Sequence, residues 1–82
     1  MDEKLNAVLK SVFDLSDSDL KEDLPKDSVP RWDSLTHMDL IASIEREFGI
    51  ELGVEDIIRM VSLDAIRTVV KGRLNGYERT AA

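Results

Sequence analysis

The chain has 82 residues, the size of one small domain, and it contains no cysteine, so neither disulfides nor cysteine-bound zinc can stabilise it. Its one histidine, His37, cannot form a histidine-rich site, and we expect no metal site. A formal net charge of −6 at pH 7 argues against nucleic-acid binding and membrane insertion, and it favours partner proteins with basic patches.

Residues 3–14 and the polar stretch after them predict a helix followed by a long loop. Apolar side chains in residues 3–14 recur at the spacing of one helical face, namely Leu5, Val8, Leu9, Val12 and Phe13. Residues 15–33 are rich in serine, aspartate and proline, which favour turns, and they allow only a short helical turn near residues 18–23. Apolar residues spaced through this loop indicate that it is pinned to the core: Leu15, Leu20, Leu24, Val29 and Trp32.

Residues 34–48 predict a second helix that has two apolar stripes. The stripe expected to face the core consists of His37, Leu40, Ile41, Ile44 and Phe48. The other stripe consists of Leu35, Met38 and Ala42 and is flanked by acidic residues. A small bundle can bury only one stripe completely, so the second stripe is either a docking surface or a set of residues packed under the preceding loop.

The rest of the chain predicts a short helix and a final long helix. Gly49 should end the second helix in the left-handed conformation, residues 55–60 allow one or two helical turns, and Ser62 should cap the last helix. We expect Asn75-Gly76 to stop that helix and residues 77–82 to form a mobile C-terminal tail. The predicted fold class is all-α: a small four-helix bundle, with three main helices plus one short helix and a long loop between helices 1 and 2, in a domain of residues 1–76.

Ser34 lies where the loop meets the second helix, and three interpretations of it are open. A catalytic serine needs a base and a substrate cleft, but His37 falls on the core stripe and the chain is too small for such a cleft, so we do not expect an enzyme. Ser34 could instead be the N-cap of the helix, a role that Asp33 could equally fill. Thirdly, another enzyme could attach a phosphodiester to an exposed hydroxyl there, because a helix N-terminus favours negative charge.

The residues around Ser34 resemble those of the acyl carrier protein family. The resemblance rests on Asp33-Ser34-Leu35, on Leu40-Ile41 and on the run Ile44-Glu45-Arg46-Glu47-Phe48-Gly49-Ile50-Glu51-Leu52. It extends from the first helix to about Leu74 and implies a four-helix bundle in which Ser34 carries 4′-phosphopantetheine. A phosphopantetheinyl transferase would attach this covalent cofactor from coenzyme A. Acyl groups would then be carried as thioesters on its thiol in a fatty-acid, lipid or polyketide-type pathway.

The resemblance also implies binding residues and partners. Asp33 would lie beside the cofactor, and partner enzymes would dock on the second helix at Leu35, Met38, Asp39, Ala42 and Glu45. These partners are the transferase, an acyl-loading ligase and pathway enzymes with basic docking patches. Trp32 stands where carriers of fatty-acid synthesis usually have a small residue, and Arg46 interrupts a run that is normally acidic. These departures favour a specialised carrier.

Two alternatives and the location of the protein complete the predictions. The chain could be an aminoacyl or peptidyl carrier, although peptidyl carriers usually have glycines before the serine, where this chain has Asp33. It could also be a non-enzymatic helical interaction domain in which Ser34 is only a helix cap. No apolar run is long enough to span a bilayer, and Met1-Asp2-Glu3 lacks the basic residues of a secretory signal, so we expect a cytoplasmic protein. We also expect it to be a monomer.

Overall fold

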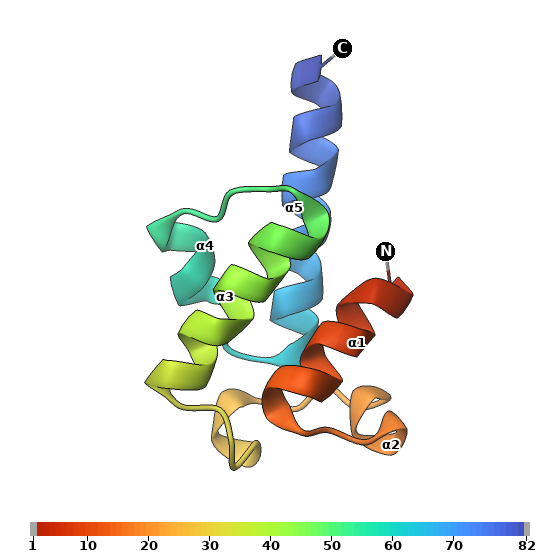
Figure 1. Cartoon of the computed structure of the whole chain (residues 1–82), viewed down its shortest axis with the longest axis vertical. Helices are drawn as coiled ribbons and strands as arrows, with labels where there is room; N and C mark the ends of the chain where they lie inside the picture. The colour runs from red at the N-terminus through yellow and green to blue at the C-terminus, as the bar shows by residue number, and fades with distance from the viewer. Residues whose placement is uncertain (1, 82) are drawn as a thin grey trace.

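The regular structure is helical, as the spacing of apolar residues predicts. The computed structural model describes the backbone of residues 2–81 and the side chains of residues 3–74. Its elements are α1 (Asp2–Phe13), α2 (Asp17–Leu20), the 3-10 helix η1 (Lys26–Ser28), α3 (Ser34–Phe48), α4 (Val54–Arg59) and α5 (Leu63–Ala81) (Figure 1). Within residues 2–81 the chain forms helices and no strand, so the all-α class is confirmed.

The core consists of one face from each of the three long helices, joined by residues of the connections. The fully buried large side chains are Leu5, Leu9 and Phe13 of α1, Leu40 and Ile44 of α3, Met60, and Leu63, Ile66 and Val70 of α5. Each such aliphatic side chain contributes about 1.5–3 kcal/mol by leaving water. On α3 the predicted core stripe is confirmed, because Leu40, Ile41 and Ile44 are buried while His37 and Phe48 are half-buried.

The connection between α1 and α3 contains α2 and η1, so the prediction of one long loop is wrong in part. Ser16 and Asp19 form a capping box that starts α2: Ser16 Oγ accepts from the Asp19 N–H at 3.2 Å, and Asp19 Oδ2 accepts from the Ser16 N–H at 3.0 Å. The helical turn therefore begins at Asp17 and ends at Leu20, slightly earlier than predicted.

The later part of this connection is attached to the start of α5 by backbone hydrogen bonds, and the prediction that the connection is pinned to the core is confirmed. The Lys26 N–H donates to the Val61 carbonyl at 2.9 Å, and the Leu63 N–H donates to the Leu24 carbonyl at 3.0 Å. Val29 and Trp32 are buried, and three further apolar residues of the connection pack against the core, namely Leu15, Leu20 and Leu24.

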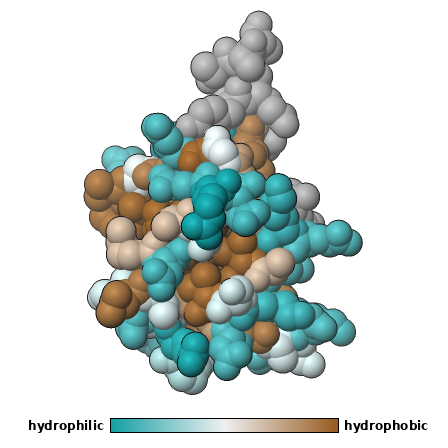
Figure 2. Space-filling view, viewed as in Figure 1, coloured by the Kyte–Doolittle hydropathy of each residue, from teal (hydrophilic) through white to brown (hydrophobic). Residues whose placement is uncertain are grey.

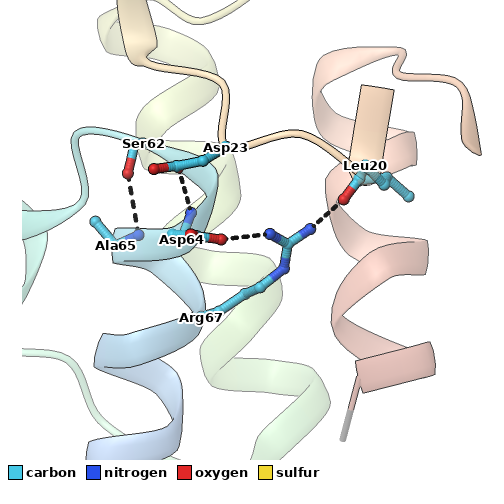
Figure 3. A network of polar contacts seen from close by, with 6 residues as sticks. All are labelled: Leu20, Asp23, Ser62, Asp64, Ala65 and Arg67. Carbon is cyan, nitrogen blue, oxygen red and sulfur yellow. Dashed lines mark hydrogen bonds and ion pairs between the residues drawn. The ribbon is translucent and has the colours of Figure 1, made fainter. Parts of the chain in front are cut away.

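Polar contacts also join α2 to the first turn of α5 (Figure 3). Arg67 Nη2 donates to the Leu20 carbonyl at 2.8 Å, and Arg67 Nη1 forms an ion pair with Asp64 at 2.9 Å. The Asp64 N–H donates to Asp23 Oδ1 at 3.0 Å, and Ser62 Oγ accepts from another N–H of the same turn at 3.1 Å. The prediction that Ser62 caps the last helix is confirmed, and the Asp23 carboxylate is a second side-chain acceptor for the backbone N–H groups at this helix start.

Helix α5 continues further than predicted. It passes through Asn75-Gly76 and ends at Ala81, so the predicted stop at this pair is wrong. An interior glycine costs roughly 1 kcal/mol relative to alanine, but unlike proline it removes no backbone donor, and so it does not oblige a helix to end. The mobility of residues 77–82 stays a prediction, and Ala82 and the side chains after Leu74 lie outside the described residues. None of the helices in the described part of the chain is long and apolar enough to cross a membrane.

Candidate functional site

The turn that begins α3 carries Ser34, and a capping box holds this turn in place. Asp33 Oδ1 accepts from the Thr36 N–H at 2.9 Å, and Thr36 Oγ1 accepts from the Asp33 N–H at 2.8 Å. The Thr36 hydroxyl also contacts the carbonyl of Arg31. Asp33 is therefore the N-cap, and Ser34 is the first residue of α3, with an exposed side chain. This assignment overturns the interpretation of Ser34 as the helix cap.

The electrostatics of this turn suit a negatively charged group on Ser34. The Thr36 N–H, more than any other group, lowers the pKa of the Asp33 carboxyl, so Asp33 is ionised at neutral pH. Ser34 Oγ projects from the positive end of the α3 dipole, where a phosphodiester is favoured. The Asp33 carboxylate opposes a second negative charge, but both groups are exposed to solvent, which screens them. The residues present therefore fit a phosphate-linked group at Ser34.

Trp32 and His37 form the buried side of the same turn. The Trp32 indole is 5% exposed and stacks on the ring of Phe13 in α1, with 4.6 Å between ring centroids. Its Nε1–H donates to His37 Nδ1 at 2.9 Å, and His37 Nε2 lies 3.0 Å from the carbonyl oxygen of Ile57 in α4. Both nitrogens of His37 are thus engaged away from Ser34, so His37 is not a base for this serine.

The second apolar stripe of α3 is exposed. Leu35 is 76% exposed and Met38 is 56% exposed, and Asp39 and Ala42 are exposed beside them. Of the two interpretations of this stripe, packing under the preceding loop is therefore excluded. Glu45 differs from the other four predicted docking residues, because it is half-buried and its Oε2 accepts from the Leu52 N–H at 2.9 Å.

Three further large apolar side chains are exposed on α4 and just after it, and the sequence did not reveal their exposure. Val54 is 72% exposed, Ile58 is 67% exposed and Val61 is 56% exposed. Figure 2 shows hydrophobic side chains on the left of the view, where α4 and the start of α3 lie in Figure 1. A helix of six residues is too short for its apolar spacing to show which face is buried. We call Leu35, Met38, Val54, Ile58 and Val61 the apolar surface.

Comparison with known proteins agrees with this geometry. A family model described as a phosphopantetheine attachment site matches residues 3–70. A search of curated proteins and a search of solved structures gave no match. Domains of this family are carriers rather than catalysts: they hold covalent 4′-phosphopantetheine and interact with a phosphopantetheinyl transferase and with the enzymes of a pathway. The resemblance to acyl carrier proteins is thereby confirmed. Since the match covers most of its 82 residues, the chain belongs to the family of phosphopantetheine attachment domains.

Proposed function

We propose that the protein is an acyl carrier protein in which Ser34 is the attachment residue. The observation that carries this proposal is the exposed Ser34 side chain at the first position of α3, next to the Asp33 cap. Because Asp33 satisfies the helix start, the serine hydroxyl has no capping role to lose when it is modified. The chain has no cysteine, so the thiol for thioester chemistry comes from the cofactor itself.

Partner enzymes dock on the exposed side of α3 and α4. Leu35 and Met38 supply apolar contacts, Ala42 leaves room for close approach, and the exposed Asp39 attracts a basic patch. Glu45 adds negative charge to this face while its Oε2 remains bound to the backbone of the α3–α4 connection. We extend the docking surface to the α4 side of the apolar surface, because exposed apolar patches of this kind mark interaction sites.

The cargo is an acyl intermediate of a lipid or polyketide-type pathway, and the carrier is a specialised one. Arg46 supports this choice, because it places an exposed positive charge on α3, where a basic partner would be repelled. At an exposed position this repulsion amounts to less than about 1 kcal/mol, enough to shift preference among related partners. A dedicated ligase that loads this carrier completes the proposal.

Intact-mass measurement tests the attachment residue. The protein is incubated with coenzyme A, Mg²⁺ and a broad-specificity phosphopantetheinyl transferase, alongside Ser34→Ala and the control Ser43→Ala, which alters a half-buried serine of the same helix. We expect the wild type and Ser43→Ala to gain the mass of one phosphopantetheine group and Ser34→Ala to gain nothing. A folded wild type that gains no mass with several transferases, or a gain in Ser34→Ala, would contradict the proposal.

A further inference from the structure

We propose that His37 is a positioning residue: through its two ring nitrogens it holds the turn that carries Ser34 and the helix α4 in one fixed arrangement. The consequence for partner enzymes rests on the carrier function proposed above. The arrangement itself is a property of the folded chain and can be measured without any partner.

The contacts of His37 define the protonation state of its ring. The Trp32 indole N–H is a donor only, so His37 Nδ1, 2.9 Å away, must be the unprotonated acceptor. The carbonyl oxygen of Ile57 is an acceptor only, so His37 Nε2, 3.0 Å away, must carry the proton and donate it. One neutral tautomer, with the proton on Nε2, satisfies both contacts.

Each of the two hydrogen bonds holds a different element. The bond to Trp32 fixes an indole that packs on Phe13 of α1 and lies two positions before Ser34. The bond to Ile57 fixes α4, whose six residues are too few to form a stable helix alone. The His37 ring therefore links three parts of the fold: α1, the turn that carries Ser34, and α4.

This link brings the two halves of the apolar surface together. Met38 follows His37 directly on α3, and Ile58 follows Ile57 directly on α4, so the bond between His37 and Ile57 sets the relative position of two exposed apolar side chains. α4 lies beside α3 in Figure 1. A partner that contacts both helices meets a preorganised surface, and it does not have to order α4 at the cost of binding energy.

Nuclear magnetic resonance tests the link directly, because the chain has one tryptophan and one histidine, and their ring signals need no further assignment. We expect an unprotonated Nδ1 and a protonated Nε2 on His37, and a scalar coupling across the hydrogen bond from Trp32 Nε1. A protonated Nδ1 in the folded protein at neutral pH, or a Trp32 indole N–H that exchanges freely with water, would overturn the proposed link.

Three variants measure what the link holds. His37→Phe removes both nitrogens and keeps a ring, Trp32→Phe removes the indole N–H together with part of the buried ring, and His37→Gln keeps a terminal N–H for Ile57. We expect hydrogen exchange of the α4 amides to rise about fivefold in His37→Phe, the factor that corresponds to one lost hydrogen bond, and to return toward the wild-type rate in His37→Gln. In the double variant the effects of His37→Phe and Trp32→Phe should come to less than their sum, because the bond between Trp32 and His37 is lost in both single variants.

Transferase kinetics then test the consequence for partners. We expect His37→Phe to raise KM for the carrier by at most about fivefold with kcat near the wild-type value, because Ser34 is unchanged while a smaller fraction of the molecules has the ordered surface. Ile66→Val is the matched control: it weakens the core without touching His37, and it should leave KM unchanged while the protein stays folded. A folded His37→Phe variant with wild-type exchange in α4 and wild-type KM would refute the proposal. If the wild type itself is not modified, the carrier function fails, while the exchange rates still decide whether His37 positions α4.

Discussion

Two adjacent residues, Asp33 and Ser34, share the start of α3 and divide its tasks. Asp33 supplies the oxygen that satisfies the Thr36 N–H, and Ser34 presents its hydroxyl to solvent. The order matters, because a serine that capped the helix would give up a stabilising hydrogen bond each time it was modified. In this chain Asp33 makes the capping hydrogen bond, so we expect the stability of the helix start to be independent of a modification of Ser34.

Substitutions at these two positions should therefore differ in their effect on stability. Asp33→Ala should lower the midpoint of urea denaturation clearly, because the N-cap is lost, whereas Ser34→Ala should change the free energy of unfolding by no more than about 0.5 kcal/mol. Asp33→Asn, which keeps a capping oxygen, is the control and should lie near the wild type. An equal loss of stability in Ser34→Ala and Asp33→Ala would show that the serine, too, supports the helix start.

At the scale of elements, α4 depends on anchors outside itself. Asp56 is 6% exposed, and its Oδ2 accepts from the Gly53 N–H at 3.0 Å, which starts the helix. The same oxygen lies 2.6 Å from Arg73 Nη2 and 2.7 Å from Arg73 Nε, which attaches α4 to α5. Burial alone would raise the pKa of Asp56, but the Gly53 N–H and the Arg73 guanidinium outweigh it, and the pKa is lowered.

This balance predicts how the stability of the protein depends on pH. A carboxyl whose pKa is lower in the folded than in the unfolded state stabilises the fold above its unfolded pKa, about 4, and this contribution is lost as the pH falls through the lowered folded value. Asp56→Asn should cost about 1–3 kcal/mol at pH 7 and should lose less additional stability than the wild type on acidification below pH ~4. Urea denaturation at several pH values measures both effects.

The matched control for this prediction is Glu55→Gln on the same helix. Glu55 is exposed and its oxygen lies 3.9 Å from Arg59, so its removal should change stability little. A loss of stability in Glu55→Gln as large as that in Asp56→Asn would mean that the net charge of α4, rather than the Asp56 anchor, is what matters.

At the scale of the whole molecule, charge and apolar surface act together. The chain carries a net charge of −6, while the exposed large apolar side chains of residues 3–74 lie on α3, on α4 and just after α4. In the docking that we propose, long-range attraction would bring a basic partner to the molecule, and apolar contact would then retain it. The two contributions respond differently to salt, because salt screens charges but does not weaken apolar contact.

Transferase assays at two salt concentrations should separate these contributions. We expect Asp39→Lys to raise KM for the carrier several-fold at roughly 0.05 M salt, with a much smaller effect at roughly 0.3 M, where charges are screened beyond a few ångströms. Leu35→Ala should raise KM at both concentrations. The control is Glu3→Lys, which makes the same change of charge on α1, on the other side of α3 from α4 in Figure 1. Equal effects of Asp39→Lys and Glu3→Lys would show that net charge alone, and not a docking face, controls the encounter.

The sequence predicts those features that local spacing determines. The bounds of α3 follow from a polar junction at Asp33 and a left-handed glycine at Gly49, and both are local signals. The spacing could not tell whether Leu35 and Met38 were covered, because that depends on the path of the preceding connection. It also could not show that Glu45 reaches the backbone of Leu52, seven positions later, since this contact depends on how the chain between them folds.

The remaining differences arise where local preference is weak. Asn75-Gly76 lowers helix propensity without forbidding a helix, so α5 continues to Ala81. The sequence predicts only a packing role for Trp32 and His37. His37 makes two hydrogen bonds, one to Trp32 and one to Ile57, and these form only when the connection before α3, α3 itself and α4 are all in place. These contacts are properties of the tertiary structure and carry no pattern in the sequence.

The location of Trp32 has an optical consequence. It is the one tryptophan of the chain, its indole is almost fully buried, and it lies two positions before Ser34 in contact with Phe13 and His37. Its fluorescence therefore reports the polarity and contacts of the serine turn without any added label. An arm or a partner that moves this turn changes the emission, whereas a molecule that leaves the turn and the contacts of Trp32 in place leaves it unchanged. The protein thus contains its own fluorophore beside Ser34, the attachment residue that we propose.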